Sequence, residues 1–89
     1  MRRYIKHVKT QRFRKHYQAL PYHVQQLADK SFALLKQNPR HPSLTLKKVR
    51  SYWAARVGPK YRTLASEREG TFFWFWIGTH DEYVRLINN

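Results

Sequence analysis

The stretch FFWFWIGTHDEY, residues 72–83, places six large apolar residues in a row and turns polar after a glycine. A run that is apolar at both odd and even positions is typical of a strand covered on both faces. It is far shorter than the about 20 apolar residues that a membrane-spanning helix needs. We therefore predict a strand in the middle of a sheet over 72–77, which brings His80 to one edge of that sheet.

Three short segments before this run are also rich in strand-forming residues. They are LTLKKV (44–49), YWAARV (52–57) and YRTLAS (61–66). Turn signals at Gly58-Pro59 and at Glu69-Gly70 separate the last three strands of the series. This spacing predicts antiparallel strands joined by hairpins.

The first half of the sequence has a different period. Weak alternation over 3–8 predicts a short edge strand, and Thr10 is expected to cap a basic helix over 11–20. Pro21 stands where a second helix would begin, and the prolines after Asn38 end it. The apolar stripe of this second helix consists of Val24, Leu27, Ala28, Phe32 and Leu35.

Together these elements predict an α+β fold in a single domain over residues 1–89. An N-terminal strand and a helical hairpin pack on one side of a mainly antiparallel four-stranded sheet. The segment HDEYVRLI (80–87) fits a final helical turn or a short strand equally well, because its period does not separate the two.

The charge of the chain restricts its partners. Eighteen Lys and Arg stand against five Asp and Glu, for a net charge of +13. Such a surface is attracted to polyanions, so nucleic acid is the first partner to consider, with an acidic protein as an alternative. The positive residues are spread over the expected helices and strands rather than along one amphipathic helix, which disfavours a membrane surface.

Several other classes of site lack the residues they require. The absence of cysteine excludes disulfides, thiolate metal sites and a cysteine nucleophile, and it fits a reducing cytoplasm. No apolar region of signal-peptide length follows the cationic start of the sequence. The histidines show no close pair at metal-ligand spacing, and the three glycines are too far apart for a phosphate-binding loop. We expect neither a metal ion nor a nucleotide cofactor.

Alternation along the strands points to candidate site residues. Trp53, Ala55 and Val57 suit the core, so Arg56 faces the opposite way. The direction of Arg62 is ambiguous, because apolar residues lie on both faces of its strand. A cationic hollow edged by aromatic rings would bind phosphates and stack a base. Its candidate RNA-binding residues are Lys47, Lys48, Arg50, Tyr52 and Tyr83. Each charge taken alone could equally belong to an ordinary solvated surface.

The order of these elements resembles the toxins of the RelE/ParE superfamily. The segments that carry the resemblance are NPRHPSLTLKKV, YWAARVGPKYRTLAS and IGTHDEY, within a match from about Phe13 to Ile87. It implies a small basic toxin that an acidic, partly disordered antitoxin neutralises. RelE-like members cleave mRNA on the ribosome, whereas ParE-like members inhibit DNA gyrase.

Some of the functional residues of the family have a counterpart in this sequence, and others do not. Arg62 matches an arginine that helps to hold the scissile phosphate in the nucleases, and His80 matches a histidine that some of the nucleases use for proton transfer. The lysines that RelE uses in the first strand of this hairpin have no counterpart, because Tyr52, Trp53, Ala54 and Ala55 stand there.

The chemistry of RNA cleavage can be weighed independently. Attack by the 2′-hydroxyl needs a base, an acid for the leaving oxygen and cations for the charge on phosphorus. His80, Arg56 and Arg62 would form a minimal catalytic set without metal. We therefore expect a ribosome-dependent mRNA endonuclease, with a gyrase inhibitor and a non-catalytic basic RNA-binding module as alternatives. In either alternative His80 would be a structural residue at the start of a helix.

Overall fold

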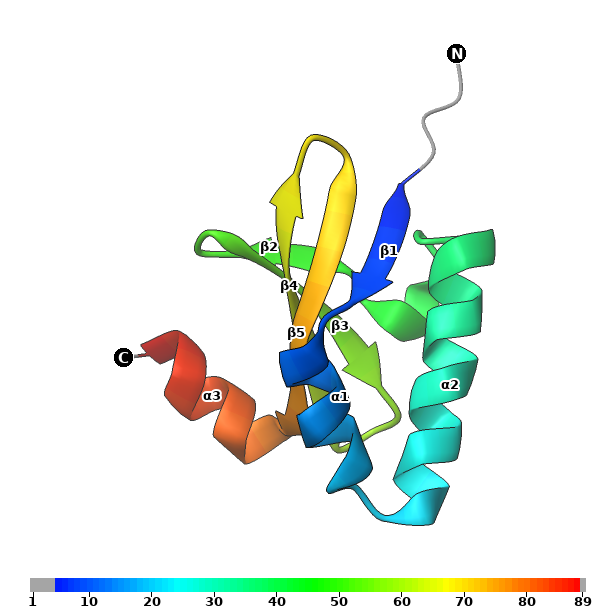
Figure 1. The fold of residues 1–89 in the computed structure, drawn as a ribbon, viewed down its shortest axis with the longest axis vertical. Helices are drawn as coiled ribbons and strands as arrows, with labels where there is room; N and C mark the ends of the chain where they lie inside the picture. Colours follow the sequence, from blue (N-terminus) through cyan, green and yellow to red (C-terminus); the bar gives the residue numbers. More distant parts are fainter. Residues whose placement is uncertain (1–4, 89) are drawn as a thin grey trace.

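The computed structural model describes residues 5–88 (Figure 1). Arg3 and Tyr4 of the expected first strand lie outside the described residues. In chain order the elements are β1 (Lys6–Lys9), α1 (Gln11–Gln18), α2 (Tyr22–Gln37), a 3₁₀ helix (Pro42–Leu44), β2 (Lys47–Val49), β3 (Tyr52–Val57), β4 (Tyr61–Arg68), β5 (Thr71–Thr79) and α3 (His80–Asn88).

The strands form one sheet in the order β1-β5-β4-β3-β2. β2, β3, β4 and β5 are antiparallel neighbours, and β1 pairs with β5 in parallel. The four-stranded prediction is therefore wrong by one strand, because β1 joins the same sheet. β5 lies between two strands, so the prediction of an interior strand is confirmed.

Polar contacts fasten β1 to β5. The backbone N–H and the side-chain hydroxyl of Thr10 both donate to the carbonyl oxygen of Trp74, each at 3.0 Å. The indole N–H of Trp74 donates to Nδ1 of His7 at 3.0 Å. The Thr10 hydroxyl also accepts from the backbone N–H of Phe13 at 3.1 Å, which confirms Thr10 as the cap of α1.

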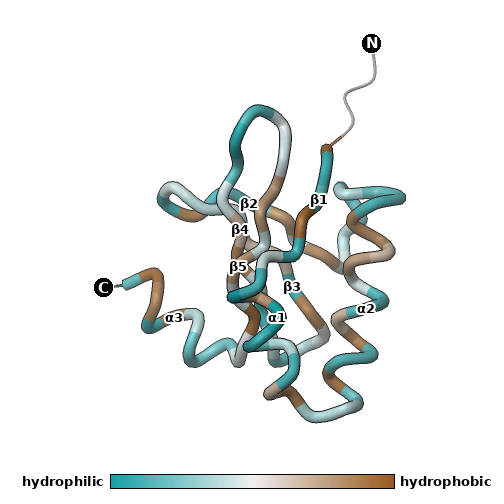
Figure 2. Tube along the Cα trace, viewed as in Figure 1, coloured by the Kyte–Doolittle hydropathy of each residue, from teal (hydrophilic) through white to brown (hydrophobic). Residues whose placement is uncertain are grey.

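Helices α1 and α2 cover one face of the sheet and form the larger core with it (Figure 1). α2 begins directly after Pro21, as expected, and it buries the predicted stripe except for Leu27, which is partly buried. Figure 2 shows apolar residues along the interior strands and hydrophilic residues at the β4–β5 turn. The fully or nearly fully buried members of this core are Phe13, Ala28, Phe32, Leu35, Leu44, Ala55, Val57, Ala65, Phe72, Trp74 and Ile77.

The other face of the sheet is covered as well. Here α3 packs across β4 and β5 and forms a smaller core of Ala54, Leu64, Trp76 and Tyr83. The helical hairpin thus packs on one side of the sheet, as expected, and α3 covers the other side. The open question about residues 80–87 is settled in favour of a helix.

A β-bulge allows β5 to supply both cores. Leu64 pairs with Trp76 while the next residue, Ala65, pairs with Trp74, so Phe75 is an extra residue on β5. An extra residue reverses the alternation of a strand. Trp74 therefore points into the larger core and Trp76 into the smaller one.

The strand expected over 44–49 is shorter than predicted. Leu44 ends the 3₁₀ helix and is buried in the larger core, and Thr45 has a φ of 46°. This left-handed residue interrupts any strand, so β2 starts only at Lys47. None of the helices within residues 5–88 is long and apolar enough to span a membrane.

Candidate active site

Two arginines face each other across the β3–β4 hairpin. Arg56 pairs directly with Arg62 in the antiparallel register. Arg62 shares its strand face with Leu64, which is buried beneath α3, so both guanidinium groups lie on the α3 side of the sheet. The ambiguity in the direction of Arg62 is thereby resolved.

Each arginine is held by a nearby carbonyl group. Nη1 of Arg62 donates to the carbonyl oxygen of Tyr61 at 2.7 Å, and Nε of Arg56 donates to that of Gly58 at 3.2 Å. Burial lowers the pKa of Arg62, the like charge of Arg56 lowers it further, and Tyr83 opposes this. The charged form of Arg62 is thus disfavoured by its surroundings, and a bound anion would relieve that cost.

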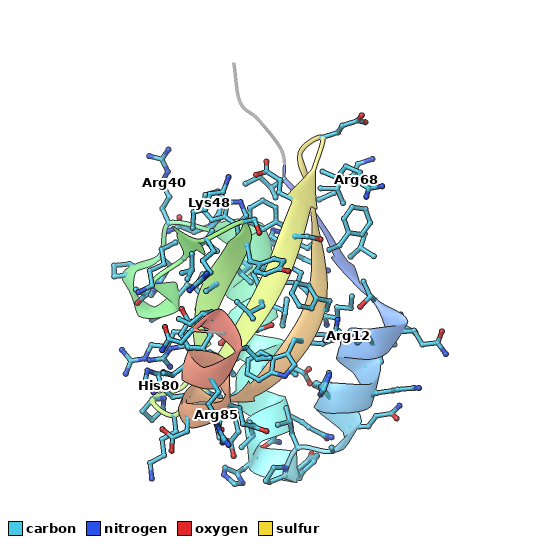
Figure 3. All side chains as sticks on the ribbon, turned by 90° about the vertical axis from the view of Figure 1, so that its left-hand side faces the viewer. Arg12, Arg40, Lys48, Arg68, His80 and Arg85 are labelled. Carbon is cyan, nitrogen blue, oxygen red and sulfur yellow. The ribbon has the colours of Figure 1, made fainter. Side chains whose placement is uncertain are left out.

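His80 approaches the arginines from the end of β5. It is the first residue of α3, and its backbone N–H donates to the carbonyl oxygen of Lys60 at 2.8 Å. Its ring lies 6.0 Å from the ring of Tyr83, one helical turn later. The side chain is exposed, and in the view of Figure 3 it lies at the left-hand edge of the molecule, beside α3.

A cavity of about 150 Å³ brings these groups together. Five of the eight predicted site residues line it, together with Thr45, Ala54 and Ala55. A second, more open hollow of about 520 Å³ adjoins it and shares Arg62 and His80 with it. The five predicted residues in the smaller cavity are Lys47, Arg56, Arg62, His80 and Tyr83.

Neither a family model nor a curated protein matches the sequence. The structure does superpose on solved toxins. A chain of the RelB–RelE antitoxin–toxin complex from Methanococcus jannaschii matches with a TM-score of 0.68 and 18% identity, over 89% of this chain and 96% of that chain. The protein has the RelE-type toxin fold.

Two further structures support this assignment of the fold. YafQ from E. coli strain BL21(DE3) matches with a TM-score of 0.70 and 14% identity, over 89% of this chain and 97% of that chain. A chain of the archaeal RelE–RelB complex from Pyrococcus horikoshii OT3 matches with a TM-score of 0.68 and 16% identity, over 84% of this chain and 93% of that chain. The RelE-type fold expected from the sequence is thus confirmed.

On this RelE-type scaffold, three predicted residues lie outside the cavity. Lys48 pairs with Trp53, so it projects from the face that α1 and α2 cover, and Figure 3 shows it far from His80. Arg50 is an exposed residue in the β2–β3 turn with a φ of 57°. Tyr52 lies on the same face as Arg56, but its ring packs against Phe75, with ring centroids 5.2 Å apart.

The cavity and the hollow also contain residues that the sequence reasoning missed. Thr45, the left-handed residue before β2, lines the smaller cavity. Lys60 and Asp81 line the larger hollow together with His80. One signal was present in the sequence: Thr79-x-x-Glu82 is a helix-capping pattern, and it marks the start of α3.

The cavity contains positively charged side chains and a side chain that can transfer a proton. Within residues 5–88, no three His, Asp or Glu side chains gather as a metal site would require. Two guanidinium groups and a lysine offer fixed donors for a phosphate, since guanidinium matches its geometry. The imidazole of His80 beside them is a group that can accept or donate a proton.

Proposed function

We propose that this protein is the toxin of a toxin–antitoxin pair and that it cleaves mRNA on the ribosome. The observation that carries the proposal is the shared cavity of Arg56, Arg62 and His80. Phosphate-binding groups and a proton-transfer group meet there on one face of a RelE-type fold. The net charge of +13 favours association with an RNA-rich particle.

The proposed reaction uses the 2′-hydroxyl of the RNA itself. A base removes the proton of this hydroxyl, and the oxygen attacks the adjacent phosphorus. The bond from phosphorus to the 5′-oxygen breaks, an acid protonates that oxygen, and a 2′,3′-cyclic phosphate remains. Arg56 and Arg62 would stabilise the negative charge that builds up on phosphorus, and His80 would transfer one of the protons. Tyr83 would stack against a neighbouring base.

An acidic antitoxin is the proposed protein partner. Two of the similar structures are complexes of RelE with RelB. A negatively charged segment would be attracted to the basic face around the cavity, and it would compete there with RNA. We place this activity in the cytoplasm, where the ribosomes are.

Induced expression of two site variants tests the proposal. His80→Gln should slow mRNA cleavage by about 10²-fold or more, which is typical for loss of general acid–base catalysis. Arg62→Ala should also slow it, because the phosphate loses a donor. Primer extension on total mRNA measures cleavage, and growth after induction measures toxicity. His23→Gln is the matched control, because His23 is exposed on α2 and lines neither cavity.

The same experiment separates the alternatives. If His80→Gln cleaves mRNA like the parent, His80 is only a structural residue and the proposed proton transfer is wrong. If the parent leaves mRNA intact but blocks supercoiling by purified DNA gyrase, the nuclease proposal fails and the gyrase alternative replaces it.

A further inference from the structure

The first turn of α3 is closed by a reciprocal pair of contacts between Thr79 and Glu82. Oε1 of Glu82 accepts from the backbone N–H of Thr79 at 2.9 Å and from its hydroxyl at 3.0 Å. In return, the hydroxyl of Thr79 accepts from the backbone N–H of Glu82 at 3.2 Å. This is a capping box, which fixes the direction in which a helix leaves the preceding chain.

Close packing at Gly78 seats this capping box against the sheet. Gly78 is buried, and a Cβ atom placed on it would clash with the ring of Trp76 and would lie 2.8 Å from Oε1 of Glu82. The Glu82 carboxylate therefore lies directly against the end of β5. Only glycine leaves room for that approach.

His80 lies between the two members of the capping box. Its own backbone N–H is bound to the carbonyl oxygen of Lys60, at the β3–β4 turn. The first turn of α3 is thus tied to the hairpin that carries Arg56 and Arg62. The exposed imidazole takes its position over the cavity from these backbone anchors.

We propose that Glu82 is a positioning residue for the cleavage reaction: by capping α3 it holds His80 against the two arginines. This inference rests on the proposed nuclease function. Glu82 does not line either cavity, so it acts through the backbone of the first helical turn rather than on RNA.

The charges around Glu82 support this role at neutral pH. The bonds from the backbone and the hydroxyl of Thr79 lower the pKa of Glu82, while burial opposes the shift. Arg85 on α3 and His16 on α1 lower the pKa further. The carboxylate is therefore ionised and accepts both bonds under the conditions in which the site would work.

Steady-state cleavage by the purified protein with ribosomes and mRNA tests the inference. Glu82→Ala should lower kcat by about 10- to 100-fold with little change in KM, because small misplacements of a catalytic group are that costly. Glu82→Gln should retain most of the rate, since an amide oxygen accepts the same bonds. In a His80→Gln background, Glu82→Ala should lower kcat little further, because both changes remove the same contribution, that of a correctly placed His80 imidazole.

Glu67→Ala is the matched control for the stability cost. Glu67 is also an exposed acid that accepts a side-chain bond, from the indole N–H of Trp53 at 3.0 Å, and it lies near the other end of β4. This variant should cleave like the parent. Glu82→Ala with an unchanged kcat would overturn the inference, and so would a full additional loss in the His80→Gln background.

An NMR titration of the His80 ring signals separates failure of this inference from failure of the proposed function. Glu82→Ala should shift these signals, whereas Glu82→Gln and Glu67→Ala should leave them near the positions of the parent. If the parent cleaves no RNA, the nuclease proposal is wrong, and the ring signals alone test whether Glu82 positions His80. Identical His80 signals in Glu82→Ala and in the parent would show that Glu82 does not position His80.

Discussion

The facing arginines of the β3–β4 hairpin should make the site electrostatically unfavourable for the free protein. Like charges directly opposite in an antiparallel pair are destabilising, and we take for the repulsion the scale of about 0.2–1 kcal/mol that favourable cross-strand pairs have. Because Arg56 is exposed and Arg62 is only partly buried, screening by solvent favours the lower half of that range. Arg56→Gln removes one of the two charges, so it should raise stability while it removes a phosphate donor.

Thermal unfolding followed by circular dichroism measures this gain. A domain of this size shifts its melting temperature by about 4–8 °C per kcal/mol, so Arg56→Gln should melt roughly 1–4 °C above the parent at low salt. At about 1 M salt the screening length falls to about 3 Å, and the difference should nearly vanish. The same variant should cleave mRNA more slowly, so stability and activity would change in opposite directions.

Two controls isolate the charge pair. Arg56→Lys keeps the charge and also loses the Nε bond to Gly58, so it should show no gain. Arg68→Gln removes a strand arginine that faces Thr71, far from His80 in Figure 3, and should leave the melting temperature almost unchanged. A lower melting temperature for Arg56→Gln, or an equal rise for Arg68→Gln, would refute the reasoning.

Two further predictions concern the larger core. Trp74→Ala should lower the free energy of unfolding, measured in urea, by about 3–5 kcal/mol, because Trp74 is fully buried. Phe75→Ala should lower it clearly less, because Phe75 is only partly buried. Equal losses of stability in the two variants would contradict this prediction. Burial lowers the pKa of His7, and Lys36 lowers it further, so the unfolded chain binds a proton at higher pH than the folded chain does. Stability should therefore fall as the pH drops below about 6.5, and His7→Phe should remove this dependence. The same slope in both proteins would exclude His7 as its cause.

Helices α1 and α2 and the interior strand were predictable because local signals marked them. Thr10 and Pro21 stand where α1 and α2 begin, and each acts through its own side chain or ring. The bulge at Phe75 was not predictable, because a run that is apolar at every position does not show which residue is the extra one. Without the bulge, the separate roles of Trp74 and Trp76 could not be assigned.

For the site residues, the sequence could assign only the face of a strand on which a side chain lies, and only where that strand alternates clearly between apolar and polar residues. The face of Arg56 followed from its own strand, but that of Arg62 required the hairpin register. Lys47 and Lys48 looked equivalent in the sequence, yet neighbours in a strand point to opposite faces, and only Lys47 reaches the cavity. The start of α3 was readable from Thr79-x-x-Glu82, a signal that apolar spacing does not carry.

The parallel pairing of β1 with β5 has a consequence for the timing of folding during synthesis. The bonds of Thr10 and His7 to Trp74 span 64 and 67 positions of the chain. At about 5–20 residues per second, translation needs roughly 3–13 s to make that intervening chain. For this interval the apolar face of α1 lacks β5, its main partner in the sheet, whereas α2 can pack on β3 as soon as that strand is made. The nascent protein therefore passes several seconds with the apolar face of α1 uncovered, during which chaperones can bind it.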